Sequence, residues 1–325
     1  MNQNKNPNFV FADSMKTENR NAYLALLVVC IVWGVSWVGT KEAVRNMPPF
    51  QMVGIRQIMA GLCYILFFIF RGDKLPAKKN WGPILLLSLL NFMISNGLAT
   101  WGVKLTTAGI SAIIGAIFPL WLVLILTLKG GNKIPRLAYL GMLLGFAGIC
   151  LIFYDHLKEL FNYEFLAGIL IGLIAALAWA YGTIYTKEFA ADFNPYQSIG
   201  WQMLISGIVL NIGATAAGQT IPITEITLRT WEAIIFLVVI SSILAFLAYL
   251  YALQRLPASL VSTYAYINPI VAMFAGHLFL HEKLSWLIME GSIVTLTGVY
   301  IVNRALQKNN KKGEVLPAAP MDEVI

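Results

Sequence analysis

The chain has 325 residues, of which 58% are hydrophobic and only 12% are charged. Soluble domains carry roughly 25% charged residues, so this sequence cannot cover a water-facing surface, and the mean hydropathy of +0.71 agrees. The net charge of +7 comes mostly from Lys and Arg between apolar runs, which indicates membrane topology and argues against a nucleic-acid partner. Composition therefore excludes an ordinary soluble protein and predicts one embedded in the lipid bilayer.

Residues 1–21 are polar and lack the apolar core of a signal peptide, so we expect an N-terminal tail. Ten apolar segments follow, each of about 19 to 23 residues, the length that crosses the ~30 Å hydrocarbon core. Backbone groups in lipid need partners within their own segment, so every segment is predicted to be a helix and the protein to be all-α. The predicted spans are 22–40, 50–70, 82–102, 106–128, 136–154, 165–187, 196–218, 230–252, 258–280 and 284–304. We expect residues 305–325 to form a polar C-terminal tail.

The distribution of basic residues predicts the orientation of the spans. If the N-terminus lies inside, sixteen Lys and Arg residues fall in the inner segments and six in the outer loops, while Arg56 lies within a helix. Membrane proteins retain Lys and Arg on the cytoplasmic side. We therefore predict that both termini are cytoplasmic in a multi-pass protein of the cell membrane, of the bacterial inner-membrane type.

The sequence repeats itself. Residues 33–42 match residues 179–188 at an offset of 146, and several Pro and Gly residues follow the same register. The aligned pairs at this offset and at a later offset of 150 are Pro49 with Pro195, Gly54 with Gly200, Gly61 with Gly207, Pro119 with Pro269, Gly141 with Gly291, and Gly148 with Gly298. We therefore predict two five-helix repeats, 22–154 and 155–304. Because five is odd, the two halves must insert in opposite orientations, an arrangement typical of secondary transporters. Repeats also occur in channels.

Several motifs resemble a known family. They are Trp33-Gly34 with Lys41, Pro49 with Arg56, the prolines Pro119 and Pro269, Leu256-Pro-Ala-Ser-Leu260, Asn268-Pro269, and the stretch Phe279 to Leu284. In these motifs the chain resembles the drug/metabolite transporter superfamily, specifically the EamA-type ten-helix permeases. The resemblance implies a cavity surrounded by helices 1, 3, 4, 6, 8 and 9, and substrates such as amino acids, purines, sugar phosphates, cofactors or drugs. One departure is Asn132, which stands in the first half where Glu282 stands in the second.

Pro119 and Pro269 fall near the middle of the fourth and ninth spans. A proline inside a helix removes one backbone hydrogen bond and clashes with the carbonyl four residues earlier. We therefore predict a hinge or cavity-lining kink at both positions. The alternative is a static packing bend.

Aromatic and amide residues gather in several spans, and we predict that they bind substrate. The predicted substrate-binding residues are Trp33, Trp37, Asn96, Trp101, Trp179, Tyr185, Tyr264 and Asn268. Tyr264 and Asn268 are four residues apart and share a helix face, and we expect the Asn268 amide beside the carbonyl that Pro269 frees at Ala265. The alternatives are interfacial aromatic belts and hydrogen bonds between helices.

Four ionisable residues are candidates for coupling or gating. Arg56 and Glu290 lie inside apolar segments, where a charge is costly and usually functional or paired. Lys41 and Lys187 end the first and sixth helices. The alternatives are snorkelling or interfacial anchoring for the basic residues and a structural hydrogen bond for Glu290.

Small-residue faces predict close helix packing. They are Gly141-x-x-x-Gly145-x-x-Gly148 and Gly168-x-x-x-Gly172. Sequence alone leaves open whether these faces pack within one chain or form a homodimer.

No metal-ligand spacing, phosphate-binding glycine loop or Ser/His/Asp grouping is present, so we expect no metal, no cofactor and no enzymatic activity. The function predicted best is a secondary transporter of a small organic solute. The aromatic and amide residues favour a neutral or zwitterionic solute such as an amino acid. A passive channel is the first alternative, and a membrane-embedded enzyme is the second.

Overall fold

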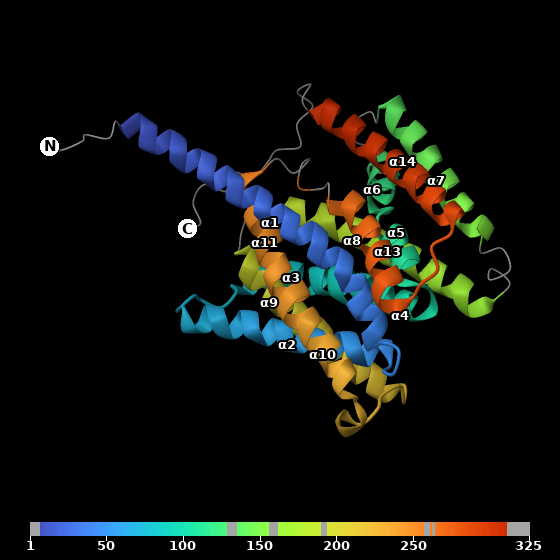
Figure 1. Cartoon of the computed structure of the whole chain (residues 1–325). Helices are drawn as coiled ribbons and strands as arrows, with labels where there is room; N and C mark the ends of the chain where they lie inside the picture. Colours follow the sequence, from blue (N-terminus) through green and yellow to red (C-terminus); the bar gives the residue numbers. More distant parts are fainter. Residues whose placement is uncertain are drawn as a thin grey trace.

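The computed structural model describes residues 7–128, 135–155, 162–189, 194–256, 261 and 264–310, and every regular element in this part is helical (Figure 1). The first half contains α1 (Pro7–Ala43), α2 (Pro49–Phe70), η1 (Lys78–Asn80), α3 (Trp81–Leu87), η2 (Ser88–Asn96), α4 (Gly97–Leu105), α5 (Ala108–Gly115), α6 (Phe118–Leu128) and α7 (Arg136–Asp155). The second half contains α8 (Tyr163–Phe189), α9 (Pro195–Ala216), η5 (Ile223–Glu225), α10 (Leu228–Phe236), η6 (Leu237–Leu244), α11 (Ala245–Arg255), α13 (Tyr264–Leu280) and α14 (Trp286–Asn310). Each predicted apolar segment therefore overlaps helical residues in the part of the chain that the structure describes.

Six helical stretches are long and apolar enough to cross a membrane, and three shorter apolar helices accompany them in the described part of the chain. The six stretches are Arg20–Ala43, Pro49–Phe70, Lys78–Leu105, Tyr163–Thr186, Pro195–Ala216 and Leu228–Ala252. The outer surface carries large apolar side chains that are more than half exposed, among them Phe67, Leu143 and Ile212. An apolar surface of this kind suits contact with lipid tails. The total of ten spans stays a prediction.

Several element boundaries differ from the sequence prediction, among them the end of α14 at Asn310, inside the predicted tail 305–325. Helix α1 begins at Pro7, inside the predicted tail 1–21, because no Gly or Pro interrupts the chain between Pro7 and Gly34. The predicted span 106–128 is two helices, since the chain turns at residues 116 and 117 between α5 and α6. Pro119 is the second residue of α6, a position where a proline's missing N–H costs no intrahelical hydrogen bond. The predicted kink at Pro119 is therefore a break between helices.

The third helix of each half contains a π-helical stretch. In the first half it is η2, flanked by α3 and α4, and in the second half it is η6, flanked by α10 and α11. Stretches of π-helix are rare and occur often at functional sites. Here both stretches reach the central cavity, with Asn96 of η2 and Ser241 of η6 in its lining.

Helices α2 and α9 pack against each other in opposite directions. A Cβ added to Gly54 would lie 3.0 Å from the Gly207 oxygen, and one added to Gly61 would lie 2.8 Å from the Gly200 oxygen. In the sequence repeat, Gly54 aligns with Gly200 and Gly61 with Gly207. Each glycine thus contacts the repeat partner of the other, which is the pattern that a two-fold relation between the helices produces.

Helices α7 and α14 follow the same rule and lie side by side at the right of Figure 1. A Cβ added to Gly141 would lie 2.6 Å from the Gly298 oxygen, and one added to Gly148 would lie 2.6 Å from the Gly291 oxygen. The other glycine face meets its own chain as well, because a Cβ at Gly168 would lie 2.8 Å from the Leu105 side chain. Both glycine faces therefore have contacts within the chain, and a homodimer stays a prediction.

Candidate functional site

A cavity of about 200 Å³ lies between the two halves. One water needs about 10–15 Å³ by a comparable measure, so the cavity has room for a small organic solute. The first half contributes residues from α1, α2, η2, α4, α5 and α6, and the second half contributes residues from α8, η6, α11 and α13. The resemblance implied lining by helices 1, 3, 4, 6, 8 and 9, and all six contribute, together with α2.

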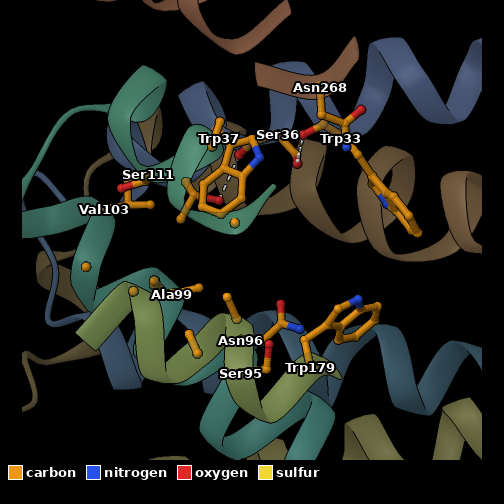
Figure 2. Close-up of a pocket in the computed structure, with 18 of the residues that line it drawn as sticks. Trp33, Ser36, Trp37, Ser95, Asn96, Ala99, Val103, Ser111, Trp179 and Asn268 are labelled. Atoms are coloured by element: carbon orange, nitrogen blue, oxygen red, sulfur yellow. Dashed lines mark hydrogen bonds between the residues drawn. The ribbon is translucent and has the colours of Figure 1, made fainter. Parts of the chain in front are cut away.

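Tryptophans form much of the cavity wall. Figure 2 shows Trp33, Trp37 and Asn268 on one side of the cavity and Asn96 and Trp179 on the other. Trp33 and Trp179 are partners in the sequence repeat, so one equivalent position from each half reaches the same space. Along α1 the lining residues follow the spacing i, i+3, i+4 and i+7, which places them on one helix face. These residues are Trp33, Ser36, Trp37 and Thr40.

Trp33 is held firmly. Its ring centroid lies 5.1 Å from that of Phe246, 5.3 Å from that of Tyr249 and 5.0 Å from that of Tyr264. Its indole Nε1 donates a hydrogen bond to the backbone oxygen of Ser241 in η6, at 3.3 Å. Aromatic pairs at such distances add about 0.5–1.5 kcal/mol each beyond burial. Trp33 therefore joins α1 to the second half while lining the cavity.

Asn268 lies in the lining, and its amide forms hydrogen bonds within α13 and across to α1. In the amide orientation that satisfies its neighbours, Nδ2 donates to the backbone oxygens of Cys30 at 2.9 Å and Tyr264 at 3.1 Å. The sequence predicted that the amide lies beside the Ala265 carbonyl and named no hydrogen-bond partner. The bond to Cys30 is possible because α1 packs closely on α13, where a Cβ on Gly34 would lie 2.5 Å from the Val271 side chain. At this short separation the amide reaches across to α1.

Arg56 is a buried cation beside the cavity. It projects from α2, is 9% exposed and belongs to the lining. Its Nε donates to the Ser242 hydroxyl at 2.8 Å, and one terminal nitrogen lies 3.5 Å from the Ser241 hydroxyl. Serine hydroxyls accept hydrogen bonds but do not neutralise the charge.

Polar residues gather at one end of the helix bundle, and Lys41, Glu42, Arg45, Arg229 and Glu282 are named here the end cluster. Lys41 Nζ donates to the backbone oxygens of Val103 (2.8 Å), Lys104 (3.0 Å) and Thr106, and so caps the carboxyl end of α4. The Glu282 carboxylate accepts from the backbone N–H groups of Ala108 (2.7 Å) and Gly109 (3.2 Å) at the start of α5.

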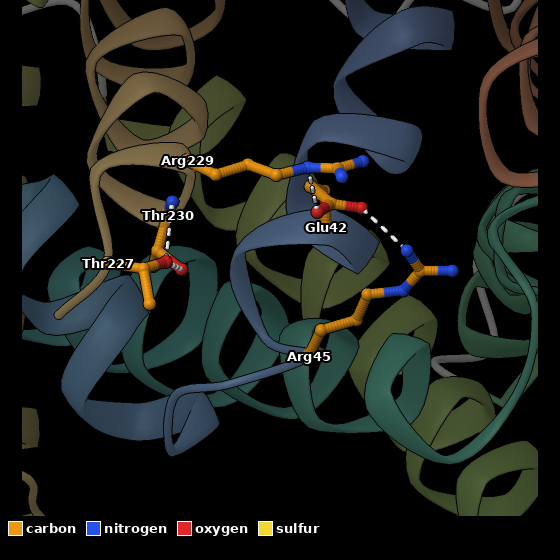
Figure 3. Close-up of polar contacts among 5 residues, drawn as sticks. All are labelled: Glu42, Arg45, Thr227, Arg229 and Thr230. Atoms are coloured by element: carbon orange, nitrogen blue, oxygen red, sulfur yellow. Dashed lines mark hydrogen bonds and ion pairs between the residues drawn. The ribbon is translucent and has the colours of Figure 1, made fainter.

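Glu42 links the two halves at the same end. Its carboxylate lies 2.6 Å from Arg229 Nε at the start of α10 and 3.0 Å from a terminal nitrogen of Arg45 (Figure 3). Thr227 caps α10 by accepting from the Thr230 N–H at 3.3 Å, which fixes the helix start that carries Arg229. The Glu42 and Glu282 contacts therefore join the first half to the second.

The remaining predicted residues lie away from the cavity lining or outside the described residues. Trp101 is 38% exposed and packs edge-on against Phe50 at 5.5 Å. Tyr185 is half-buried in α8, Glu290 is exposed on α14, and Pro269 is buried inside α13, but none of them lines the cavity. The side chains of Lys187 and Pro119 lie outside the described residues.

Small residues in the lining were missed by the sequence analysis. Hydroxyl groups come from Ser36, Thr40, Ser95, Thr100 and Ser111, and space comes from Gly172, Ala175 and Ala176 of α8. Such residues are common in membrane helices for packing reasons, so the sequence gives no signal that separates these positions. The sequence did single out Arg56, because it is a charged residue inside an apolar span. A place in the cavity lining could have been expected for it on that ground.

The EamA-like transporter family model matches residues 20–154 and again residues 166–304. The chain is 28% identical over 284 residues to the uncharacterized transporter YvbV of Bacillus subtilis, covering 86% of this chain and 90% of that one. It is 29% identical over 253 residues to the uncharacterized inner membrane transporter YedA of Escherichia coli, covering 78% and 80%. One crystal structure superposes with a TM-score of 0.62 at 16% identity, over 86% of this chain and 96% of that one, a likeness that shows the fold alone. Because the two family matches together span most of its length, the chain belongs to the EamA-like transporter family.

Proposed function

We propose that the protein is a secondary transporter that moves a small organic solute across the cell membrane by alternating access. The cavity between the two halves carries this proposal, because both halves supply its walls. A central site between two halves can open to either side in turn when the halves rock against each other. Membership of a transporter family supports the same reading.

The proposed architecture has two halves of opposite orientation, residues 22–154 and 155–304, between cytoplasmic tails. Support comes from the antiparallel packing of α2 on α9 and of α7 on α14, where the glycines contact each other's repeat partners. We place the protein in a bacterial inner membrane, as the relative YedA is described. The basic residues of the inner segments support the cytoplasmic placement of both ends.

The end cluster supports alternating access because its contacts are of a kind that can break. Exposed or half-exposed ion pairs contribute only about 0–1 kcal/mol, and Arg229 is 68% exposed in the pair with Glu42. A closure of this strength holds the two halves together at one end without locking them. On this proposal the contacts of Glu42 and Glu282 form when that end closes and separate when it opens.

The solute proposed is small and at least partly apolar, such as a zwitterionic amino acid. Trp33, Trp37 and Trp179 offer aromatic surface, and Asn96 and Asn268 offer amide groups. A membrane-embedded enzyme has less support, because the described lining contains no His, Cys, Asp or Glu. A passive channel has the same family support as a carrier, and transport kinetics separate the two.

A metabolite comparison tests the proposal. Cells that overproduce the protein are compared with deleted cells by untargeted analysis of cytoplasm and medium. We expect a small set of solutes to change in opposite directions in the two strains. The plugged variant Ala175→Phe fills the cavity and should abolish the change, whereas Ala147→Phe, on the exposed face of α7, should retain it. No solute difference at equal protein levels would overturn the proposal.

A further inference from the structure

Arg56 is the one charged side chain among the described residues that line the cavity. It is 91% buried by its 9% exposure and lies within the apolar helix Pro49–Phe70. A buried charge without a partner costs several kcal/mol, and charges inside membrane helices are usually paired or functional. Whether a carboxylate of the protein neutralises Arg56 therefore distinguishes a structural role from a role in binding.

The carboxylates of the described residues are committed elsewhere or lie away from the lining. Glu42 pairs with Arg45 and Arg229, Asp73 pairs with Arg71, and Glu282 accepts from the start of α5. Among the described residues, the hydrogen-bond partners of the Arg56 guanidinium are the hydroxyls of Ser241 and Ser242. A guanidinium has five N–H donors, so donors and an uncompensated positive charge remain for a ligand.

We propose that Arg56 is the anion-binding group of the cavity and that the transported solute carries a carboxylate. This inference rests on the proposed transport function and specifies its substrate class. A carboxylate matches the planar fork of a guanidinium in a bidentate contact. One cation in the lining balances one negative charge, so a monocarboxylate fits the site better than a doubly charged phosphate.

The rest of the solute follows from the other walls. The aromatic faces of Trp33, Trp37 and Trp179 suit an apolar body or, through cation–π attraction, an ammonium group. An amino acid has both a carboxylate and a group that suits the tryptophans, and so does a monocarboxylic acid with an apolar side chain. A solute without a carboxylate lacks the first of these groups. The predicted class of neutral or zwitterionic solutes is therefore narrowed to those that carry a carboxylate.

A binding assay with matched pairs of small molecules tests this assignment. The purified full-length protein in detergent is heated with each carboxylate and its carboxamide: phenylacetate and phenylacetamide, phenylalanine and phenylalaninamide, and leucine and leucinamide. Ligands that bind the folded state raise the melting temperature in proportion to the logarithm of their concentration. We expect carboxylates to raise it and the matched amides to fail at equal concentration.

Variants separate anion binding from a structural role. Arg56→Gln should weaken carboxylate binding by about thirtyfold or more, and Arg56→Lys should keep part of it because the charge remains. Arg71→Gln is the matched control, since Arg71 is exposed at the end of the same helix and outside the lining. Ser242→Ala removes a hydrogen bond that ties Arg56 to η6 but leaves the charge, so the preference for carboxylates should persist.

The assignment is wrong if the amides bind as well as the carboxylates, if Arg56→Gln retains carboxylate binding, or if no carboxylate of the panel binds. It is also wrong if phenyl phosphate binds more tightly than phenylacetate. Each of these results leaves the metabolite differences of the plugged-variant experiment intact. The failure of the carboxylate assignment and the failure of the transport proposal are therefore distinguishable.

Discussion

Single residues in this protein serve packing and the cavity at once. Trp33 lines the cavity and also donates to the Ser241 oxygen, and Asn268 lines it while donating to Cys30. The sequence predicts that these side chains avoid lipid, because an indole N–H or an amide in a membrane helix needs a partner. The identity of the partner depends on the distance between α1 and α13, which a single sequence does not encode locally.

The cavity face of α13 can be tested with single cysteines at 264, 268 and 270, in a background in which Cys30, Cys63 and Cys150 are replaced. Tyr264 and Asn268 line the cavity, whereas Ile270 is 41% exposed on the outer surface. A thiol reacts as the thiolate, which needs water to form. We expect the cysteines at 264 and 268 to react with a small water-soluble thiol reagent and to be protected by solute.

The cysteine at 270 should stay unreactive because lipid surrounds it. Reaction only at 270, or reaction at 268 that no solute slows, would show that this face of α13 does not line a solute site.

At the scale of helices, the aligned glycines of the sequence repeat lie where α2 packs on α9 and α7 packs on α14, but the sequence alone left open what these glycines contact. Glycine permits close backbone approach, and two-fold related halves bring equivalent helices together at the axis. The break between α5 and α6 was harder to foresee. A proline is compatible with a kink inside a helix or with the first turn of a new one, and Pro119 and Pro269 take different options.

The glycine contact between α2 and α9 predicts opposite effects for two similar substitutions. Gly61→Ala places a Cβ 2.6 Å from the Leu204 backbone nitrogen, and overpacking of this kind destabilises by about 1–3 kcal/mol. Gly213 lies on α9, and a Cβ added there has nothing within 4 Å; alanine favours helix by up to about 1 kcal/mol over glycine.

Thermal unfolding in detergent measures both changes. The melting temperature should fall for Gly61→Ala and stay level or rise for Gly213→Ala. Equal melting temperatures for the two variants would mean that the close approach of α2 and α9 does not support the fold.

The ion pair between Glu42 and Arg229 joins the two halves. Reversing one of its charges should therefore slow transport, and reversing both should restore part of the rate. Glu42→Arg places a third cation beside Arg45 and Arg229, so that repulsion replaces the two ion pairs of Glu42. We expect the transport rate to fall several-fold, and Glu42→Arg with Arg229→Glu to recover part of it. Glu225→Arg, an exposed reversal in the neighbouring segment η5, serves as the control.

The rate is measured with the solute identified by metabolite comparison. A double variant as slow as the single one would indicate that the pair does not act as a contact between the halves.

At the scale of the whole molecule, hydropathy predicts the class of fold, a helical membrane protein. A chain with 12% charged residues cannot cover a water-facing surface, and its long apolar segments must satisfy their backbone groups as helices. The cavity needed the structure, since its space comes from Gly172, Ala175 and Ala176, which are ordinary packing residues in a sequence. The proposed solute class rests on the structure as well, because the proposal that Arg56 binds an anion depends on which described carboxylates contact other residues.

Orientation in the membrane is a further prediction at this scale. The sixteen basic residues of the inner segments against six in the outer loops predict both termini in the cytoplasm. Reporter fusions at residue 325 should be active in the cytoplasmic format and inactive in the periplasmic one. A periplasmic C-terminus would overturn the predicted orientation and, with a cytoplasmic N-terminus, the even number of spans.

Solute counterflow in proteoliposomes tests the carrier mechanism most directly. Vesicles containing the purified protein are loaded with millimolar unlabelled solute and diluted into a trace of the labelled form. A carrier that alternates between two faces returns loaded from each side, so labelled solute should accumulate transiently above its equilibrium level, and the Ala175→Phe variant should show none. Entry of label that rises to equilibrium without an overshoot, at a rate independent of the internal solute, would contradict alternating access and identify a passive pore.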